Sequence, residues 1–136
     1  AEERPEVVAF TGDVDDEQRR RLCGAADFVL VPSRVSPEAF PAQLAQRYGA
    51  LPIAHATGGL VDAVVDADAE LETGTGFLFD RPTGAALLGA TERALAAYAS
   101  EAGFARLRRR AMRLDLGWDR PARRYAQVYR RAIEGT

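Results

Sequence analysis

Thr57, Gly58 and Gly59 have the composition of a loop that can hold a phosphate group. They follow an apolar run that ends at His55, and they precede a short apolar segment that begins at Leu60. Two residues without a Cβ atom let an oxyanion approach the amides of Gly59 and Leu60 at the positive end of a helix dipole. The alternative is a tight turn in which glycine supplies a positive φ angle. The residues by themselves leave both interpretations open.

His55 is the only histidine of the chain and lies at the expected end of a strand. It could hydrogen-bond a phosphate or a sugar hydroxyl, or it could be a capped, partly exposed histidine with no ligand. Without a second histidine, neither a histidine metal site nor a histidine-activated nucleophile is expected. The acidic residues at positions 13–17 could suggest a cation site, but capping and the helix dipole explain acids at a helix start better. We therefore expect no metal and no cofactor.

Short β-rich runs in the first 80 residues predict the strands that must position this loop. There are four such runs, at residues 6–11, 27–31, 51–55 and 77–80. The second run is continuously apolar and is ended by Pro32, which predicts a strand buried on both faces. A strand of this kind requires a layer on each side of the sheet.

Helical patterns separate these runs and fill the rest of the chain. Helices are expected at residues 15–23, 40–48 and 60–65, followed by three more, the last of which spans residues 119–133. Asp119 is the expected N-cap of that last helix. The order β-α-β-α-β-α-β, followed by helices, predicts an α/β fold with a doubly wound parallel sheet, as a single Rossmann-like domain over residues 1–136. In such a sheet ligands bind beyond the carboxyl ends of the strands, where the Thr57 loop is expected.

Composition narrows the class of protein. A chain of 136 residues with 47% apolar residues is long enough for one domain with its own core. The single cysteine, Cys23, excludes a disulfide framework and a cysteine-rich metal site. No run approaches the ~20 apolar residues of a membrane span, and the first residues lack a secretory pattern. We expect a cytoplasmic protein without a membrane partner.

The charge is balanced overall but uneven along the chain, with 18 basic and 20 acidic residues. Residues 104–136 contain ten arginines and only three acids. Arginines on the solvated faces of two helices explain this pattern better than an anionic partner does. The arginines are not interleaved with aromatic residues, and the sequence contains no nucleic-acid recognition motif. We therefore expect no nucleic-acid partner.

Four blocks of sequence resemble, in order and spacing, the C-terminal nucleotide-sugar domain of bacterial glycogen synthases and plant starch synthases. The blocks read GAADFVLVPSR, RYGALPIAHATGGLVDAVVD, TGFLF and LDLGWDRPARRYAQVYRR. The resemblance extends from about residue 10 to residue 133. It implies a part of a retaining glucosyltransferase of the two-Rossmann-domain (GT-B) type, with ADP-glucose or UDP-glucose as the donor.

The resemblance also implies roles for single residues. The family's Thr-Gly-Gly loop supports the donor phosphates, which assigns that role to Thr57, Gly58 and Gly59 and favours the phosphate interpretation of the turn. Leu60 and His55 would then belong to the same nucleotide-sugar site.

One loop departs from the family at the positions nearest the donor sugar. The family's Glu-Pro-Cys-Gly-Leu reads SPEAF here, at residues 36–40, so Ser36 holds the position of the glutamate and would face the sugar. Glu38 lies two residues further on and could act as the catalytic carboxylate only if the loop were rebuilt. Ala39 replaces the small loop glycine, and Val14 stands where relatives carry an aromatic residue that stacks on the base.

In the family, an N-terminal domain binds the α-glucan acceptor, and an arginine and a lysine neutralise the departing diphosphate. This chain contains no lysine and is too short for that domain. Losing such a group typically costs ~10²–10³ in rate, so the chain by itself is not expected to catalyse. A non-catalytic Rossmann-like scaffold or interaction module is the alternative.

The final helix, residues 119–133, is expected to pack toward the missing domain. Trp118 would anchor it, although a role as a sugar platform is also open. Without that domain the helix would expose Tyr125, Tyr129 and Ile133, which would favour self-association.

Overall fold

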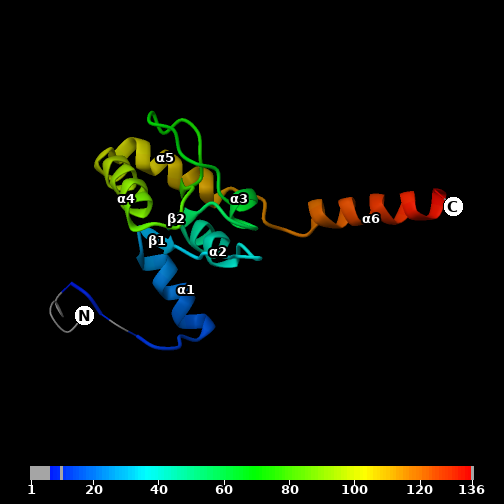
Figure 1. Ribbon diagram of the computed structural model, residues 1–136, viewed down its shortest axis with the longest axis horizontal. Helices are drawn as coiled ribbons and strands as arrows, with labels where there is room; N and C mark the ends of the chain where they lie inside the picture. Colours follow the sequence, from blue (N-terminus) through cyan, green and yellow to red (C-terminus); the bar gives the residue numbers. More distant parts are fainter. Residues whose placement is uncertain (1–6, 10, 136) are drawn as a thin grey trace.

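Three parallel strands form one sheet in the computed structural model, which describes residues 7–9 and 11–135 (Figure 1). The strands are β1 (Phe28–Val31), β2 (Leu51–His55) and β3 (Phe77–Phe79), and they lie side by side in chain order. Helix α2 (Phe40–Tyr48) connects β1 to β2, and α3 (Leu60–Ala63) followed by a long loop connects β2 to β3. The predicted α/β class with a parallel sheet is confirmed.

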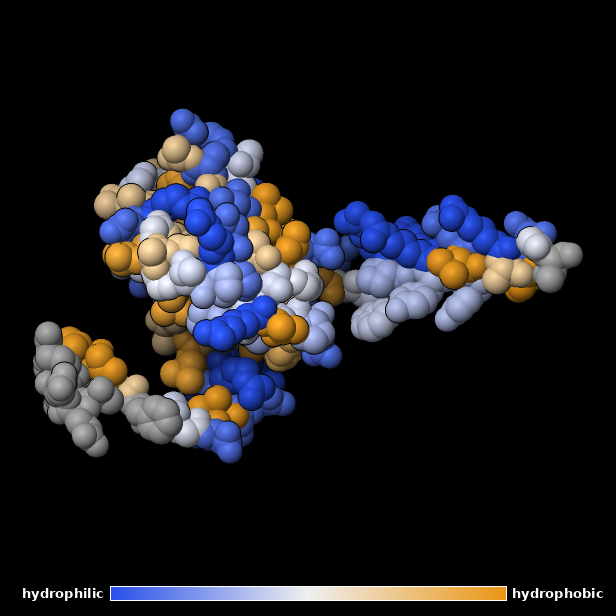
Figure 2. Space-filling view, in the orientation of Figure 1, coloured by the Kyte–Doolittle hydropathy of each residue, from blue (hydrophilic) through white to orange (hydrophobic). Residues whose placement is uncertain are grey.

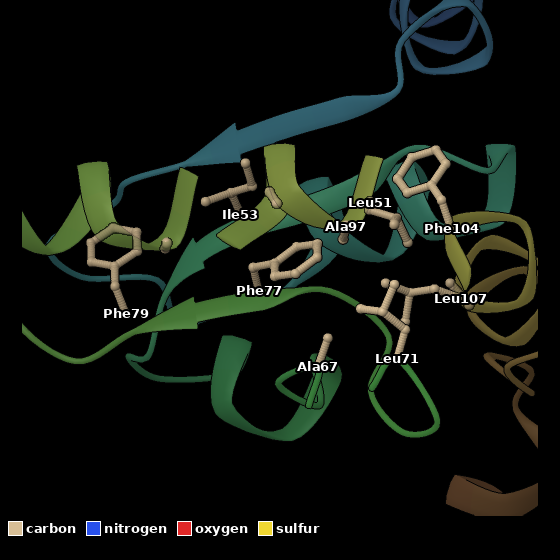
Figure 3. Packing of buried hydrophobic residues seen from close by; sticks show 12 residues of the cluster. Leu51, Ile53, Ala67, Leu71, Phe77, Phe79, Ala97, Phe104 and Leu107 are labelled. Carbon is tan, nitrogen blue, oxygen red and sulfur yellow. The ribbon is translucent and has the colours of Figure 1, made fainter. Parts of the chain in front are cut away.

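Packed layers cover both faces of the sheet. Along β2, Leu51 and Ile53 face α4 (Gly84–Ala99) and α5 (Glu101–Met112), and Ala54 faces α2 and α3. The first of these two cores is shown in Figure 3, where Phe77 lies at its centre. All five residues of β2 are buried because the strand is central and covered on both sides.

The predicted strand at residues 6–11 is not formed. Residues 7–9 and 11 have no strand conformation, and Glu6 and Phe10 lie outside the described residues. A β-rich run becomes a strand only where a neighbouring strand pairs with it. The described part of the chain therefore has three strands and not four.

Strand β1 is consequently an edge strand. Its residue Leu30 is 56% exposed, so the prediction of burial on both faces is wrong. The reason is that α4 packs mainly on β3 and β2. On this side of β1, Phe28 contacts Tyr98 and Phe104, but Leu30, two residues further on, is left uncovered.

Helix α1 (Asp16–Ala25) precedes β1 and agrees with the predicted segment within two residues. Asp15 is its N-cap, and its carboxylate accepts a hydrogen bond from Gln18 N at 2.8 Å. The Gln18 side chain accepts in turn from Asp15 N at 3.2 Å, which completes a capping box. Asp16 and Glu17 follow in the first turn of α1 and pair with Arg19 and Arg21. No group of metal-ligating side chains occurs in the described part of the chain.

A buried glutamine, Gln46, ties α2 to the segments on either side of it. Its Nε2 atom donates at 3.2 Å to Ala63 O, at the end of α3, and also to Thr75 O and Thr75 Oγ1. The Thr75 hydroxyl also accepts from Val65 N at 3.0 Å. One side chain thus joins α2, α3 and the loop that leads into β3.

The loop at residues 64–76 is held by polar contacts with α5 and within itself. From α5, Arg110 donates through Nε to Gly74 O at 2.7 Å and through Nη2 to Leu71 O at 3.0 Å and Thr73 O at 2.9 Å. Inside the loop, the Asp68 carboxylate accepts from the amide of Thr73 at 3.0 Å and from its hydroxyl at 2.8 Å. These contacts fix a long connection that has no regular secondary structure.

Helix α6 (Asp119–Glu134) extends away from the sheet, and none of its residues is buried (Figure 1). Its N-cap is Trp118 and not Asp119, and no side chain caps it. Trp118 is 75% exposed, so it is not buried against the described part of the chain, and its role as an anchor of the helix stays a prediction. Figure 2 shows a hydrophilic side of α6 and a less polar side. Tyr125 and Tyr129 of this helix are exposed, and their ring centroids lie 6.3 Å apart.

None of the helices in the described ranges is long and apolar enough to span a lipid bilayer.

Candidate functional site

The carboxyl ends of the three strands are followed by three loops, two of which contain the candidate residues of the sequence analysis. The loop at residues 32–39 follows β1, the turn at residues 56–59 follows β2, and residues 80–83 follow β3. In Figure 3 the arrowheads of the strands point toward Phe79, which marks this edge of the sheet. The first two loops contact each other directly.

The backbone of the Thr57 turn is already bonded within the protein. Gly59 N donates to Ser36 O at 3.0 Å, and Leu60 N donates to Thr57 O at 3.1 Å. The amide of Thr57 donates to His55 O at 2.8 Å. The expectation that the amides of Gly59 and Leu60 are open to a phosphate is therefore wrong, because the turn and the neighbouring loop satisfy them.

The approach of that neighbouring loop requires a glycine at position 58 and leaves little room for a side chain at position 59. Gly58 has a φ angle of +51°, and a Cβ atom added there would lie 2.0 Å from Ser36 O. At Gly59 a Cβ atom would lie 3.0 Å from Pro37 O and 3.3 Å from Ala39 N. The glycines thus join two loops at close range, which is the structural alternative that the sequence left open.

Other donors at this edge have no partner in the described part of the chain. They include the amide of Gly58 and the hydroxyl of Thr57. Within α2 the first bonded amide is Gln43 N, which donates to Ala39 O at 3.0 Å, so the earlier amide of Phe40 has no intrahelical acceptor. No side chain caps this helix, whose positive end lies beside Gly59. An anion could be held between these two loops by these donors.

The loop that departs from the family places its polar groups differently from the expectation. Ser36 is buried, and its hydroxyl donates to Glu38 O at 2.6 Å. The hydroxyl therefore closes the loop on itself and is not free for a sugar. Glu38 is exposed, so its carboxylate lies at the surface of the loop.

The side chain of His55, at the end of β2, contacts the loop after β1 and the end of β3. Its Nδ1 atom lies 2.8 Å from Ser33 O, and its ring stacks on Phe79 with 5.4 Å between ring centroids. Because a carbonyl only accepts, Nδ1 carries the hydrogen in this contact. The side chain is 6% exposed, so His55 is a buried strand-end histidine that positions the loop after β1.

An open hollow of about 490 Å³ lies beside the turn, at the end of β3. Ala56, Phe79, Asp80 and Arg93 contribute to its lining. The Arg93 guanidinium also pairs with Asp66 at 3.0 Å, across 27 positions of the chain. Sequence reasoning missed Arg93 and Asp80 because no local motif marks them and only the fold brings them to this edge.

Comparison of the sequence with known proteins finds similarity to glycogen synthases. No protein-family model matches the chain. Glycogen synthase 1 from Bradyrhizobium diazoefficiens is 37% identical over 128 residues, which are 94% of this chain and 26% of the relative. A glycogen synthase from Acidiphilium cryptum is 40% identical over 130 residues, with 93% and 27% covered.

Comparison of the fold with solved structures finds enzymes of related name. The catalytic domain of starch synthase IV from Arabidopsis thaliana, bound to ADP and acarbose, superposes with a TM-score of 0.81 and 31% identity. The match covers 90% of this chain and 26% of that one. Sucrose-phosphate synthase from Thermosynechococcus elongatus gives a TM-score of 0.67 and 29% identity, with 96% and 31% covered.

The chain thus spans about a quarter of the length of the curated relatives that it matches. Over that span both the sequence and the fold agree with the resemblance that the four sequence blocks indicated. The chain is therefore a homologue of one part of the glycogen and starch synthases, and it forms a partial glycosyltransferase-like domain.

Proposed function

We propose that this chain is the nucleotide-sugar-binding part, from the C-terminal domain, of a retaining hexosyltransferase that acts on an α-glucan. The donor is ADP-glucose or UDP-glucose, and the protein is cytoplasmic. The observation that carries the proposal is the superposition on a starch synthase catalytic domain whose structure holds ADP, at 31% identity over 90% of this chain. The fold supports it, because the unpartnered donors gather at the carboxyl edge of a parallel sheet, where such folds bind ligands.

The donor phosphates would lie between the Thr57 turn and the start of α2. The Thr57 hydroxyl and the Gly58 amide donate from one loop, and the Phe40 amide donates from the other. Gly59, Leu60, Ser36 and His55 support the site by holding these two loops together. In this arrangement the amides of Gly59 and Leu60, the Ser36 hydroxyl and the His55 Nδ1 atom donate to protein acceptors and not to the ligand.

Glu38 is the carboxylate of this loop that would lie nearest the donor sugar. Since it stands two positions after the family's glutamate, it would act from a rebuilt loop. Glu38→Gln is expected to weaken the binding of ADP-glucose without changing the binding of ADP, as measured by calorimetry with both ligands. Equal affinities of wild type and variant for ADP-glucose would remove Glu38 from the site.

Catalysis would need parts of the protein outside these 136 residues. Transfer requires cations that stabilise the leaving diphosphate in a closed cleft, and it requires an acceptor site. We propose that a further domain supplies both and that α6 packs on it. The chain by itself is expected to bind the donor without transferring the sugar.

Titration of ADP and UDP into the 136-residue chain tests the donor site. We expect a Kd below about 1 mM for one of the two nucleotides. Thr57→Val keeps the β-branched shape and removes the hydroxyl, so it should weaken binding about tenfold, the value of a hydrogen bond to a charged group. Thr91→Val, on α4, is the matched control and should change the affinity less than twofold.

Two results would contradict the proposal: no binding of either nucleotide below about 1 mM, or equal losses in the two threonine variants. Gly58→Val is not a suitable probe, because the added side chain would collide with Ser36 O whether or not a phosphate binds there.

A non-catalytic scaffold or interaction module is the second candidate. It is favoured by the occupied amides of Gly59 and Leu60 and by the Ser36 hydroxyl, which is bonded within its own loop. Absence of any nucleotide-induced change in thermal unfolding, together with a stable complex with a partner protein in size-exclusion chromatography, would select this candidate over a donor-binding domain.

A further inference from the structure

Helix α5 lies near the amino ends of the strands, whereas the Thr57 turn lies at their carboxyl ends. Its residue Phe104 contacts Phe28, the first residue of β1, with 5.4 Å between ring centroids. Leu107 is buried in the same cluster as Leu51, the first residue of β2. Figure 3 shows Phe104 and Leu107 at the end of the core away from Phe79. The solvent side of α5 is therefore separate from the proposed donor site.

Four arginines of α5 and its C-cap lie on this solvent side. Arg106, Arg109, Arg110 and Arg113 are spaced three and four residues apart, which places them on one face of the helix. Together with Leu114 they line an open hollow of about 490 Å³, and no acidic residue contributes to its lining. A hollow walled by guanidinium groups is a surface of strongly positive potential.

Two of the four guanidinium groups are already engaged. Arg110 donates to the carbonyls of the loop at residues 64–76. Arg106 pairs with Glu72, with 3.1 Å between Nη2 and Oε1. Arg109 and Arg113 have no ion pair within the described residues. They are the groups that remain available to a ligand.

The spacing of Arg109 and Arg113 indicates the size of the ligand. One turn of helix, about 6 Å of rise, separates the two residues. Guanidinium groups bind phosphate oxygens with two parallel hydrogen bonds. Like charges one turn apart also repel each other, and an anion with several charges relieves that repulsion more than a monovalent anion does. Arginines near the C-terminus of a helix are also stabilised by the helix dipole, without any ligand. An experiment must therefore distinguish a ligand site from arginines that only stabilise the helix.

We propose that the hollow lined by Arg106, Arg109, Arg110 and Arg113 is a second anion site, for a small ligand that carries two or more phosphate groups. Arg109 and Arg113 make the direct contacts, and Arg110, fixed by the loop carbonyls, keeps the floor of the hollow in place. The site does not depend on the proposed donor function, since it lies at the other edge of the sheet.

Calorimetry of the 136-residue chain with inorganic pyrophosphate at about 50 mM salt tests this site. We expect the double variant Arg109→Gln/Arg113→Gln to lose at least about tenfold in affinity. Arg130→Gln/Arg131→Gln, on α6, removes the same charge elsewhere and should lose less than about twofold. Thermal unfolding of each variant without ligand verifies that the fold is retained.

Three results would overturn the proposal. Equal losses in both double variants would show a general charge effect. A loss with Thr57→Val but not with Arg109→Gln/Arg113→Gln would place pyrophosphate at the donor edge. Binding of single-stranded RNA that the α5 variant abolishes, without any binding of pyrophosphate, would make the surface a nucleic-acid contact.

Discussion

Gly58 is held in a left-handed conformation by a carbonyl that belongs to another loop. Because a Cβ atom would lie 2.0 Å from Ser36 O, we expect Gly58→Ala to lower the free energy of unfolding by about 3 kcal/mol. Gly89→Ala, at a helical glycine with open space around it, should raise it by about 0.5–1 kcal/mol. Urea unfolding of the two variants compares these effects directly. A Gly58→Ala protein as stable as the wild type would contradict the close approach of the loops.

Asp68 makes the stability of the loop before β3 dependent on pH. The hydrogen bond from the Thr73 hydroxyl is the main cause that lowers the pKa of Asp68, with smaller contributions from two backbone amides and from Arg110. Since the pKa is lower in the folded state, this stabilisation is complete above the unfolded value near about 4 and is lost as the pH falls through the folded value.

The comparison of Asp68→Asn with wild type tests this dependence. Their melting temperatures should differ above about pH 4 and converge toward about pH 2. Glu70→Gln removes one acid from the same loop without a side-chain hydrogen bond and serves as the control. Parallel curves for wild type and Asp68→Asn across this range would count against the role of the carboxylate.

Sequence reasoning predicted that the candidate site residues lie near one another, but it did not predict their hydrogen bonds. The Thr57 turn and Ser36 do lie together at the carboxyl edge of the sheet, as a doubly wound fold requires. The acceptor of Gly59 N is a carbonyl 23 positions earlier in the chain, and no pattern of side-chain types encodes such a backbone contact. The expectation of open amides failed for this reason.

Arg110 acts at the scale of an element, because it joins α5 to the loop at residues 64–76. Arg110→Gln should lower the free energy of unfolding by about 2 kcal/mol, since three carbonyls would lose a charged donor. Arg106→Gln removes an exposed ion pair and should cost less than about 1 kcal/mol. Urea unfolding combined with limited proteolysis of the loop measures both effects. Similar costs for the two variants would show that the contacts to the carbonyls contribute little.

Elements with a strong period and clear end signals were predicted well. Helix α2 begins at Phe40 and ends before Gly49, and strand β2 spans residues 51–55, as the sequence indicated. The run at residues 6–11 has the composition of a strand but no neighbour to pair with in the described fold. The composition of a short run does not tell whether another strand or helix will pack beside it. For the same reason the sequence did not predict the exposure of Leu30 on β1.

At the scale of the whole molecule, no element within residues 7–9 and 11–135 buries the less polar side of α6. We expect the chain to self-associate weakly through Tyr125 and Tyr129, which are 54% and 63% exposed. Because the other side of α6 is rich in arginine, repulsion between copies should make the association stronger as salt rises.

Sedimentation velocity at low and high salt tests this association. Tyr125→Ser/Tyr129→Ser should shift the distribution toward the monomer, whereas Tyr48→Ser, at a tyrosine on α2, should not. A monomer at all concentrations and salt levels would exclude α6 as a contact between copies.

The hydrogen bond from Gly59 N to Ser36 O has a dynamic consequence. It connects the loop after β1 to the turn after β2. Gln46 also joins α2, which follows the first of these segments, to the end of α3, which follows the second. Neither segment can swing outward while the other stays in place. Their amide protons should therefore exchange with deuterium as one cooperative unit, and whatever stiffens one segment should slow exchange in the other.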